Sequence, residues 1–239
     1  FDKSFSIIVL PDGNATINFE HAWGDGVAVI RFFNEVYQES TSSPAIDPAS
    51  ITASAAGVKA LDWHVDERTT EYVAQATERV DAFIDSIDIA VVETDLINSN
   101  WVKAKKVSPD GFLQMSFQLA HARTHEGRAG ATYESASTSA YKHGRTETIR
   151  STTSLSQTMC DVFLDPDASR SDKEAALRAA AENHNKITRE ALMGKGWDRH
   201  MFALRTVAEA EARAGGEDVP SIFTCGAFQK LNNIILSTS

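Results

Sequence analysis

The chain has 239 residues, of which 42% are hydrophobic and 23% charged, and its formal net charge is −10. This length and composition suit a globular protein with a sizeable core, and the negative charge argues against a nucleic-acid partner. The sequence contains no run of about 18 or more apolar residues, so no membrane-spanning helix is expected. Cys160 and Cys225 lie far apart without metal or redox spacing, which indicates a reducing compartment.

The first segment predicts a β-hairpin followed by a helix. Apolar runs at 5–10 and 15–19 flank a Pro-Asp-Gly-Asn cluster, which is typical of two paired strands joined by a turn. A helix-length apolar run begins after Gly26. Residues 21–26 are therefore expected on a strand-to-helix loop, and loops on a rigid scaffold often carry catalytic groups.

This loop reads His21-Ala22-Trp23-Gly24-Asp25-Gly26. A neutral imidazole can take the proton of a hydroxyl as that hydroxyl attacks an acyl group, so His21 is a candidate general base. Asp25 fits best as the partner of a distant Arg, and Gly24 and Gly26 as residues that permit a sharp backbone path. The alternative is structural: His21 caps a strand and Asp25 starts a helix.

The rest of the chain predicts a linker followed by alternating helices and strands. Residues 39–54 are rich in Ser, Thr, Pro and Ala, as linkers are. Apolar residues at helical spacing predict a helix over 66–86, and strand-like runs occupy 87–96 and 231–236. The remaining helices are expected over 109–125, 171–192 and 197–214.

His121 and His125 stand four apart on an expected helix, a spacing that is found at metal sites. Zinc sites need about three or four ligands, and the sequence offers no third one, so no metal site is expected. The other histidines outside the first loop are expected to be packing or surface residues: His64, His143, His184 and His200.

The segment ATYESASTSAYKHGRTETIRS at 131–151, together with FEHAWGDG at 19–26, resembles the carnitine/choline acyltransferases, and most closely their palmitoyltransferase-type members. The likeness covers nearly the whole chain, with further matches at RFFNEV, SPD, WDRH and the terminal LSTS. It implies an α/β (α+β) fold of two lobes, in which helices cover mixed sheets. Only part of that fold is expected in this chain. Residues 1–65 would belong to the first lobe and 66–239 mostly to the second.

The resemblance implies reversible transfer of a long-chain fatty acyl group between CoA and carnitine, both of them substrates, with no permanently bound cofactor. His21 would take the proton of the carnitine hydroxyl, and Ser239 of the terminal Ser-Thr-Ser, supported by Ser237, would stabilise the oxyanion. Asp25 would pair with Arg145. Without the family, Ser-Thr-Ser is a polar tail and Arg145 a solvated side chain.

Carnitine carries a carboxylate, a quaternary ammonium and a hydroxyl, which need different partners. Tyr133, Ser135 and Thr146 supply hydroxyl donors for the carboxylate, and Arg199 supplies its countercharge. The matching positions of the family line the carnitine carboxylate site. Arg199 as a structural ion-pair partner is the alternative, because buried charges are rarely unpaired.

Lysines that precede Ser108-Pro109-Asp110 match positions where the family meets the CoA phosphates, and lysine is a good phosphate ligand. The resemblance thereby assigns Lys103, Lys106 and Asp110 to CoA. The family has a further Lys where this chain has Ser99, which weakens the match. Without the family, these lysines form a solvated basic run.

The resemblance also implies the matrix side of the inner mitochondrial membrane, with peripheral membrane association, although no targeting segment is evident in this chain. Members of the family are longer than 239 residues. An alternative interpretation is therefore a truncated, non-catalytic remnant that acts only as a structural or interaction module. On the same basis, the chain alone is expected to show no transferase activity.

Overall fold

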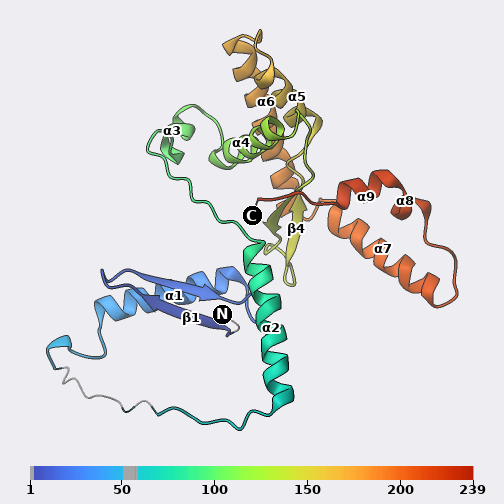
Figure 1. Ribbon diagram of the computed structural model, residues 1–239. Helices are drawn as coiled ribbons and strands as arrows, with labels where there is room; N and C mark the ends of the chain where they lie inside the picture. The colour runs from blue at the N-terminus through green and yellow to red at the C-terminus, as the bar shows by residue number, and fades with distance from the viewer. Residues whose placement is uncertain (1–2, 51–56, 58, 239) are drawn as a thin grey trace. The chain divides into compact units, whose positions relative to one another are not determined.

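The computed structural model describes residues 3–50, 57 and 59–238. It divides into two compact units, Phe1–Asp88 and Ile89–Ser239, which we call the N-terminal and C-terminal units and describe separately (Figure 1). Both contain helices and a small sheet, which confirms the predicted mixed α/β class. The assignment of the segments 1–65 and 66–239 to two lobes stays a prediction.

The N-terminal unit begins with the predicted hairpin. Strands β1 (Phe5–Val9) and β2 (Ala15–Phe19) pair antiparallel, with Phe5 opposite Phe19. The connecting turn contains a left-handed residue, which Gly13 supplies with a φ of 85°. The turn cluster therefore set both the position and the register of this hairpin.

Two helices follow the hairpin. α1 (Gly26–Ser42) begins after the loop, and α2 (Glu67–Asp85) forms where the apolar spacing predicted it. The expected linker over 39–54 is partly helical, because α1 continues into it and a short 3₁₀ helix, η1 (Pro48–Ser50), follows. Residues 51–54 lie outside the described residues.

Few apolar side chains of the N-terminal unit are buried. Val29 on α1 is 1% exposed and is the one buried hydrophobic residue among those described there. Phe5 lies against the rings of Trp23 and Phe32, with centroids 5.9 and 5.5 Å away, whereas Phe83 on α2 is 65% exposed. The apolar face of α2 thus forms without cover from the described residues.

The strand expected over 87–96 is wrong. The segment is irregular, and its apolar residues face solvent, with Ile89 83% and Val91 81% exposed. Alternating apolar residues form a strand only where a neighbouring strand completes the hydrogen-bond ladder. Within the described chain this segment pairs with no other strand.

The C-terminal unit contains a small mixed sheet in the order β4-β3-β5 (Figure 1). β3 (Thr132–Ser137) and β4 (Thr146–Ile149) are antiparallel, and β5 (Leu236–Ser237) runs parallel to β3. The strand expected over 231–236 is largely wrong, because the helix α9 (Gly226–Asn232) occupies its first part. Only its last residue joins the sheet.

Helix α6 (Arg170–Leu192) packs on β3 and β4, and α4 (Pro109–Thr124) and α5 (Ser154–Leu164) pack on α6. α4 and α6 were predicted, whereas α5 was not. Side-chain caps begin all three helices, including a reciprocal capping box between Thr153 and Ser156. Their shared core consists of Met115, Ala122, Met159, Cys160 and Ala180.

Three further helices complete this unit: α3 (Ser99–Ala104), α7 (Asp198–Arg213) and α8 (Ser221–Thr224). α7 confirms the helix predicted over 197–214. None of the helices in the described ranges is long and apolar enough to cross a membrane.

Candidate functional site

Strand β3 separates a solvent-facing row of side chains from a buried one. Successive residues of a strand point to opposite faces. Tyr133 and Ser135 lie on the more exposed face, whereas Thr132 and Glu134 are buried. The predicted carnitine residues of β3 therefore share one face of the sheet.

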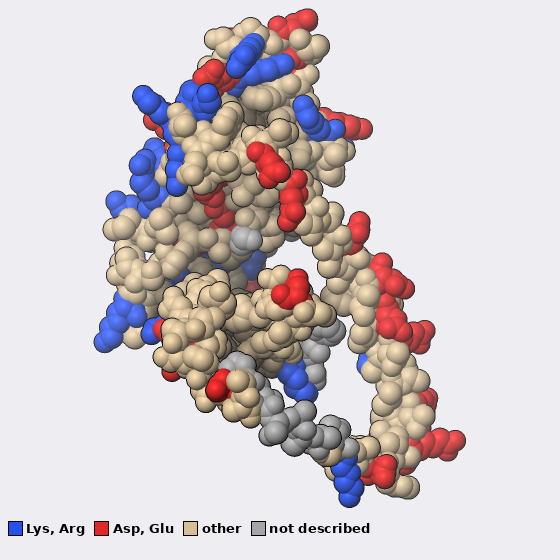
Figure 2. Space-filling view, turned by 90° about the vertical axis from the view of Figure 1, so that its left-hand side faces the viewer, with Lys and Arg blue, Asp and Glu red and all other residues tan. Residues whose placement is uncertain are grey.

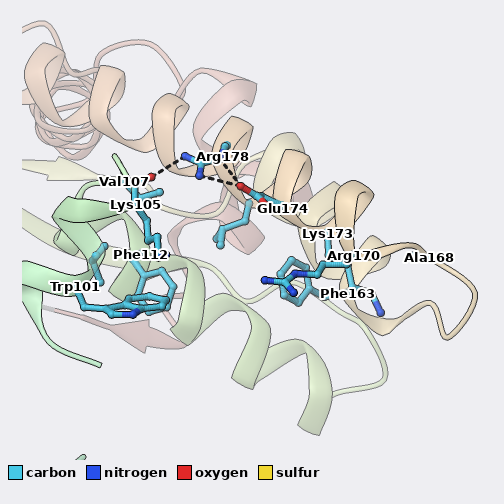
Figure 3. Close-up of a pocket in the computed structure, with 12 residues that line it drawn as sticks. Trp101, Lys105, Val107, Phe112, Phe163, Ala168, Arg170, Lys173, Glu174 and Arg178 are labelled. Atoms are coloured by element: carbon cyan, nitrogen blue, oxygen red, sulfur yellow. Dashed lines mark hydrogen bonds and ion pairs between the residues drawn. The ribbon is translucent and has the colours of Figure 1, made fainter. Parts of the chain in front are cut away.

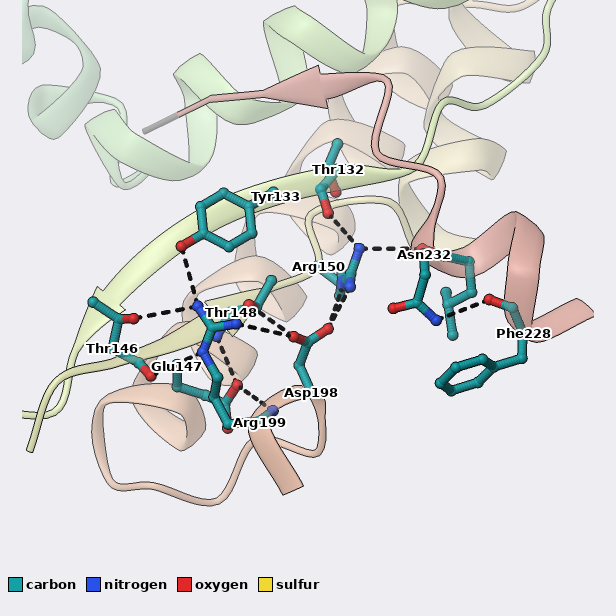
Figure 4. Close-up of polar contacts among 11 residues, drawn as sticks. Thr132, Tyr133, Thr146, Glu147, Thr148, Arg150, Asp198, Arg199, Phe228 and Asn232 are labelled. Atoms are coloured by element: carbon teal, nitrogen blue, oxygen red, sulfur yellow. Dashed lines mark hydrogen bonds and ion pairs between the residues drawn. The ribbon is translucent and has the colours of Figure 1, made fainter. Parts of the chain in front are cut away.

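The side chain of Arg199, at the start of α7, reaches Tyr133 of β3 and Thr146 of β4 (Figure 4). Its Nη2 donates to the Tyr133 hydroxyl at 3.2 Å and to Thr146 Oγ1 at 3.3 Å. Its Nε donates to the Thr146 carbonyl at 3.3 Å. The structure thus brings together three of the predicted carnitine residues, from three different elements.

Glu147 holds the backbone of Arg199. Its Oε1 accepts from Arg199 N at 3.2 Å and from Thr148 N at 2.7 Å. Gly196 makes this approach possible, since a Cβ at that position would stand 2.4 Å from Glu147 Cγ. Any larger residue there would displace Glu147 and with it the start of α7.

Asp198, the residue before Arg199 in the sequence, forms its ion pair with a different cation. Arg150 pairs with its carboxylate, with Nε 3.0 Å from Oδ2, and both side chains are 11% exposed. Arg199 Nη1 lies 3.7 Å from Asp198 Oδ1, longer than a hydrogen bond. Arg150 is therefore the main ion-pair partner of Asp198, and the guanidinium of Arg199 faces hydroxyl groups instead.

A shallow hollow of about 670 Å³ opens beside Arg199 and Thr146. Basic residues of the β3–β4 turn line it, among them Lys142 and Arg145. Gly144 closes this turn tightly, since a Cβ there would stand 1.8 Å from the Thr138 carbonyl. The surroundings of the hollow suit an anionic group.

β5 brings the C-terminal segment to the same strand. Ser237 stands beside Tyr133 in the parallel register, and Thr238 N donates to the Tyr133 carbonyl at 2.9 Å. Ser239, predicted to stabilise the oxyanion, lies outside the described residues. The predicted Ser237 and Tyr133 are thus neighbours, although they lie about a hundred positions apart in the sequence.

The predicted CoA residues lie on and after α3. Lys103 and Lys106 are exposed, and Lys106 adopts a left-handed φ of 56° where the chain turns toward α4. Asp110, in the first turn of α4, accepts from the buried His184 Nε2 at 3.0 Å. The half-exposed carboxylate of Asp110 is thereby tied to a buried imidazole, while its assignment to CoA stays a prediction.

Two pockets adjoin this segment. One of about 620 Å³ has an apolar floor that includes Phe112 and Phe163, with Lys105, Arg170 and Arg178 around it (Figure 3). A second, of about 370 Å³, is lined by the basic residues Lys106, Arg178 and Arg189 together with polar and apolar residues and the acidic Glu182. Figure 2 shows Lys and Arg side chains on the upper part of the face, interspersed with Asp and Glu.

His21 lies in the N-terminal unit, on the predicted loop between β2 and α1. It is exposed, and its ring centroid lies 5.7 Å from that of Phe19. Asp25 is the residue before the first turn of α1 and makes no side-chain cap, and its pairing with Arg145 stays a prediction. Neither Gly24 nor Gly26 has a positive φ, so the sharp path expected at these glycines does not use the left-handed region, and their role stays a prediction.

Sequence reasoning missed the polar residues that support the site. Glu147 and Asp198 stand next to predicted residues, Glu134 lies between Tyr133 and Ser135 on β3, and Arg150 directly follows β4. A charged residue at an inward-facing strand position signals a buried partner, because an unpaired buried charge is costly. That signal depends on the strands β3 and β4, which the sequence analysis did not assign.

The whole chain, residues 1–239, matches the family described as choline/carnitine O-acyltransferase. The chain belongs to this family. It is 43% identical to carnitine O-palmitoyltransferase 2, mitochondrial, of Bos taurus and 38% identical to that of Homo sapiens, in each case over all of this chain and 36% of the relative. It is 28% identical to carnitine O-acetyltransferase of Columba livia, over 37% of that protein. The chain thus spans about a third of the length of these relatives.

Proposed function

We propose that the protein containing this chain transfers a fatty acyl group reversibly between CoA and carnitine, with a preference for long chains. Relatives that are 38–43% identical to this chain are named as mitochondrial palmitoyltransferases, so we place the reaction in mitochondria, at the matrix side of the inner membrane. Family membership supports the type of reaction. The contacts of Arg199 support the assignment of one substrate group.

Those contacts are the observation that carries the proposal. Tyr133 and Thr146 accept hydrogen bonds from the same Nη2 atom of Arg199. Each hydroxyl therefore still has its own proton to donate. One cation and two hydroxyl donors that converge form a receptor for a carboxylate, which is the anionic group of carnitine.

In the mechanism that we propose, His21 takes the proton of the carnitine hydroxyl while the oxygen attacks the thioester carbonyl of acyl-CoA. Ser239 donates to the oxyanion that forms. As the intermediate collapses, the protonated His21 returns the proton to the departing CoA thiolate. The reverse direction uses the same groups on acylcarnitine and CoA, without an acyl-enzyme. Lys103 and Lys106 bind the CoA phosphates.

The test is the substitution His21→Ala in the full-length protein, with His64→Ala as the matched control in the same unit. Loss of a general base lowers a rate by about 10²- to 10⁴-fold, so we expect kcat to fall at least that far. His64→Ala should leave it unchanged, and circular dichroism should show both variants folded. CoA release from palmitoyl-CoA, with and without carnitine, measures the rate. A His21→Ala variant that retains wild-type turnover would rule out the proposed base.

The same assay distinguishes the proposed transferase from the alternative interpretation, a truncated, non-catalytic remnant. If the full-length wild-type protein releases no CoA in a carnitine-dependent way, the remnant interpretation holds. The 239-residue chain alone is a second sample. We expect it to be inactive, because a displacement of about 1 Å in a reacting group can cost about 10²-fold in rate.

A further inference from the structure

A buried cluster lies where α4, α6 and β3 meet. His184 of α6 has a side chain with no exposed surface, and its Nε2 lies 3.0 Å from Asp110 Oδ2 and 3.6 Å from Glu134 Oε2. A carboxylate can only accept, so Nε2 carries the proton that Asp110 receives. Glu134 is thus a buried carboxyl group that lies too far from this imidazole to accept a hydrogen bond from it.

This cluster lies behind the proposed substrate sites. Glu134 is the inward-facing neighbour of Tyr133 and Ser135 on β3. Asp110 belongs to the segment assigned to CoA. A shift of the Glu134 side chain would therefore be transmitted to the strand that carries the carnitine residues.

A chain of hydrogen bonds connects Glu134 to β5. Gln114 Nε2 donates to the carbonyl of Thr238 at 3.2 Å, which fixes the orientation of its amide and turns Oε1 toward Ser151. The Ser151 hydroxyl oxygen lies 3.3 Å from this Oε1 and 3.1 Å from Glu134 Oε2. Glu134, Ser151 and Gln114 are all buried.

Counting protons shows which state of Glu134 fits. Ser151 has one proton to donate. If Glu134 is ionised, the Ser151 hydroxyl faces two acceptors, Glu134 Oε2 and Gln114 Oε1. It can donate to only one of them, so the other is a buried acceptor without a hydrogen bond, which is unfavourable. If Glu134 is protonated, it donates to Ser151, Ser151 donates to Gln114, and Gln114 donates to Thr238. Every link then has a donor and an acceptor.

We infer that Glu134 is a positioning residue that carries a proton on the acid side of neutral pH, and that this proton directs the chain Glu134–Ser151–Gln114–Thr238, which holds β3 and the segment after β5 in register. The consequence for carnitine rests on the proposed function. Loss of the proton at higher pH leaves the chain one donor short. The strand that carries Tyr133 then loses a fixed support.

The electrostatics of the cluster agree with this assignment. Burial raises the pKa of Glu134 from 4.5 to about 7, the carboxylate of Asp110 adds to the rise, and the hydrogen bond from Ser151 opposes it. The titratable groups that face Glu134 are Asp110 from α4 and His184 from α6. On β4, the acidic Glu147 is engaged instead with the backbone of Thr148 and Arg199.

The first test measures the proton directly. Infrared difference spectra of the full-length protein across pH 6 to 9 should show a protonated carboxyl band that disappears with a midpoint at about pH 7. Glu134→Gln should remove the band, whereas Glu190→Gln, on the exposed side of α6, should keep it. A band that is absent from the wild type, or that survives in Glu134→Gln, would overturn the inference, whatever reaction the protein catalyses.

The second test measures the consequence for the substrate. The wild-type KM for carnitine should rise above about pH 7 by on the order of fivefold, the worth of about one hydrogen bond. Glu134→Gln, whose amide donates to Ser151 as a protonated Glu134 does, should keep the low KM at all pH values, with the kcat profile unchanged. Ser151→Ala should show the high KM throughout. A pH-dependent KM that persists in Glu134→Gln would contradict the inference, whereas a wild type without carnitine-dependent activity would contradict the proposed function instead.

Discussion

The two units differ in how well their elements are packed. The N-terminal unit formed a hairpin and two helices where predicted, yet Val29 is its one buried hydrophobic residue among those described. The C-terminal unit places α4, α5 and α6 around a shared core that includes Met115 and Met159. The comparison shows that periodicity and caps determine where an element forms, whereas packing determines what holds its side chains in place.

The same difference separates the two parts of the proposed chemistry. His21 lies on an exposed loop, where its ring stands 5.7 Å from that of Phe19. Arg199 is held by hydrogen bonds to Tyr133, Thr146 and Glu147, beneath which the buried pair of Arg150 and Asp198 lies. Within the described residues, the side chains proposed to bind carnitine are therefore preorganised, whereas the proposed base is not.

The largest effect on stability is expected from Met159→Ala. Met159 is 1% exposed in the core of the C-terminal unit, and truncation of a buried Met leaves a cavity that lowers the free energy of unfolding by about 2–5 kcal/mol. Urea unfolding of the 239-residue chain measures it. The control is Met193→Ala, since Met193 is 53% exposed. Equal effects of the two substitutions would show that this core does not stabilise the chain.

The pH dependence of the C-terminal unit is expected to follow Glu134. Its pKa is about 7 in the folded protein, against an ordinary value of 4.5. The folded state therefore binds more protons between these values, and stability falls as pH rises through that range, by up to about 3 kcal/mol. Glu134→Gln should abolish this loss and be the more stable protein at pH 8, whereas Glu190→Gln should unfold like the wild type. A Glu134→Gln variant that is less stable at pH 8 contradicts the assignment.

The sequence predicted most of the helices, and it singled out residues that the structure brings together, but it did not show the residues that support them. Helices α2, α4 and α6 followed from apolar spacing that their own residues carry. The errors at 87–96 and 231–236 have another cause, which is that a strand depends on a partner. The Ile235 N–H donates to the Ala131 carbonyl, but the paired register with β3 begins only at Leu236. The sequence also singled out Tyr133, Thr146 and Arg199, which the structure brings into contact. Glu134 and His184 make their contacts between distant segments, which one sequence does not show.

A smaller effect is expected when Arg199 is replaced by Lys. Lysine keeps the charge but loses the planar fork that reaches Tyr133 and Thr146 together. The KM for carnitine should rise by on the order of tenfold in the full-length protein, while the KM for palmitoyl-CoA stays level. Lys142→Arg, on the nearby turn, is the control. A rise confined to the KM for palmitoyl-CoA would assign Arg199 to the other substrate.

The smallest effect is expected in the N-terminal unit, from Phe83→Ser on α2. Phe83 is 65% exposed, and substitutions on an exposed surface change the free energy of unfolding by less than about 0.5 kcal/mol. Phe and Ser also have similar helix propensities, so the backbone contributes little. Urea unfolding of the 239-residue chain should therefore not distinguish this variant from the wild type. A loss above about 1 kcal/mol would mean that the apolar face of α2 is covered in solution, and that the N-terminal unit is packed as the C-terminal unit is.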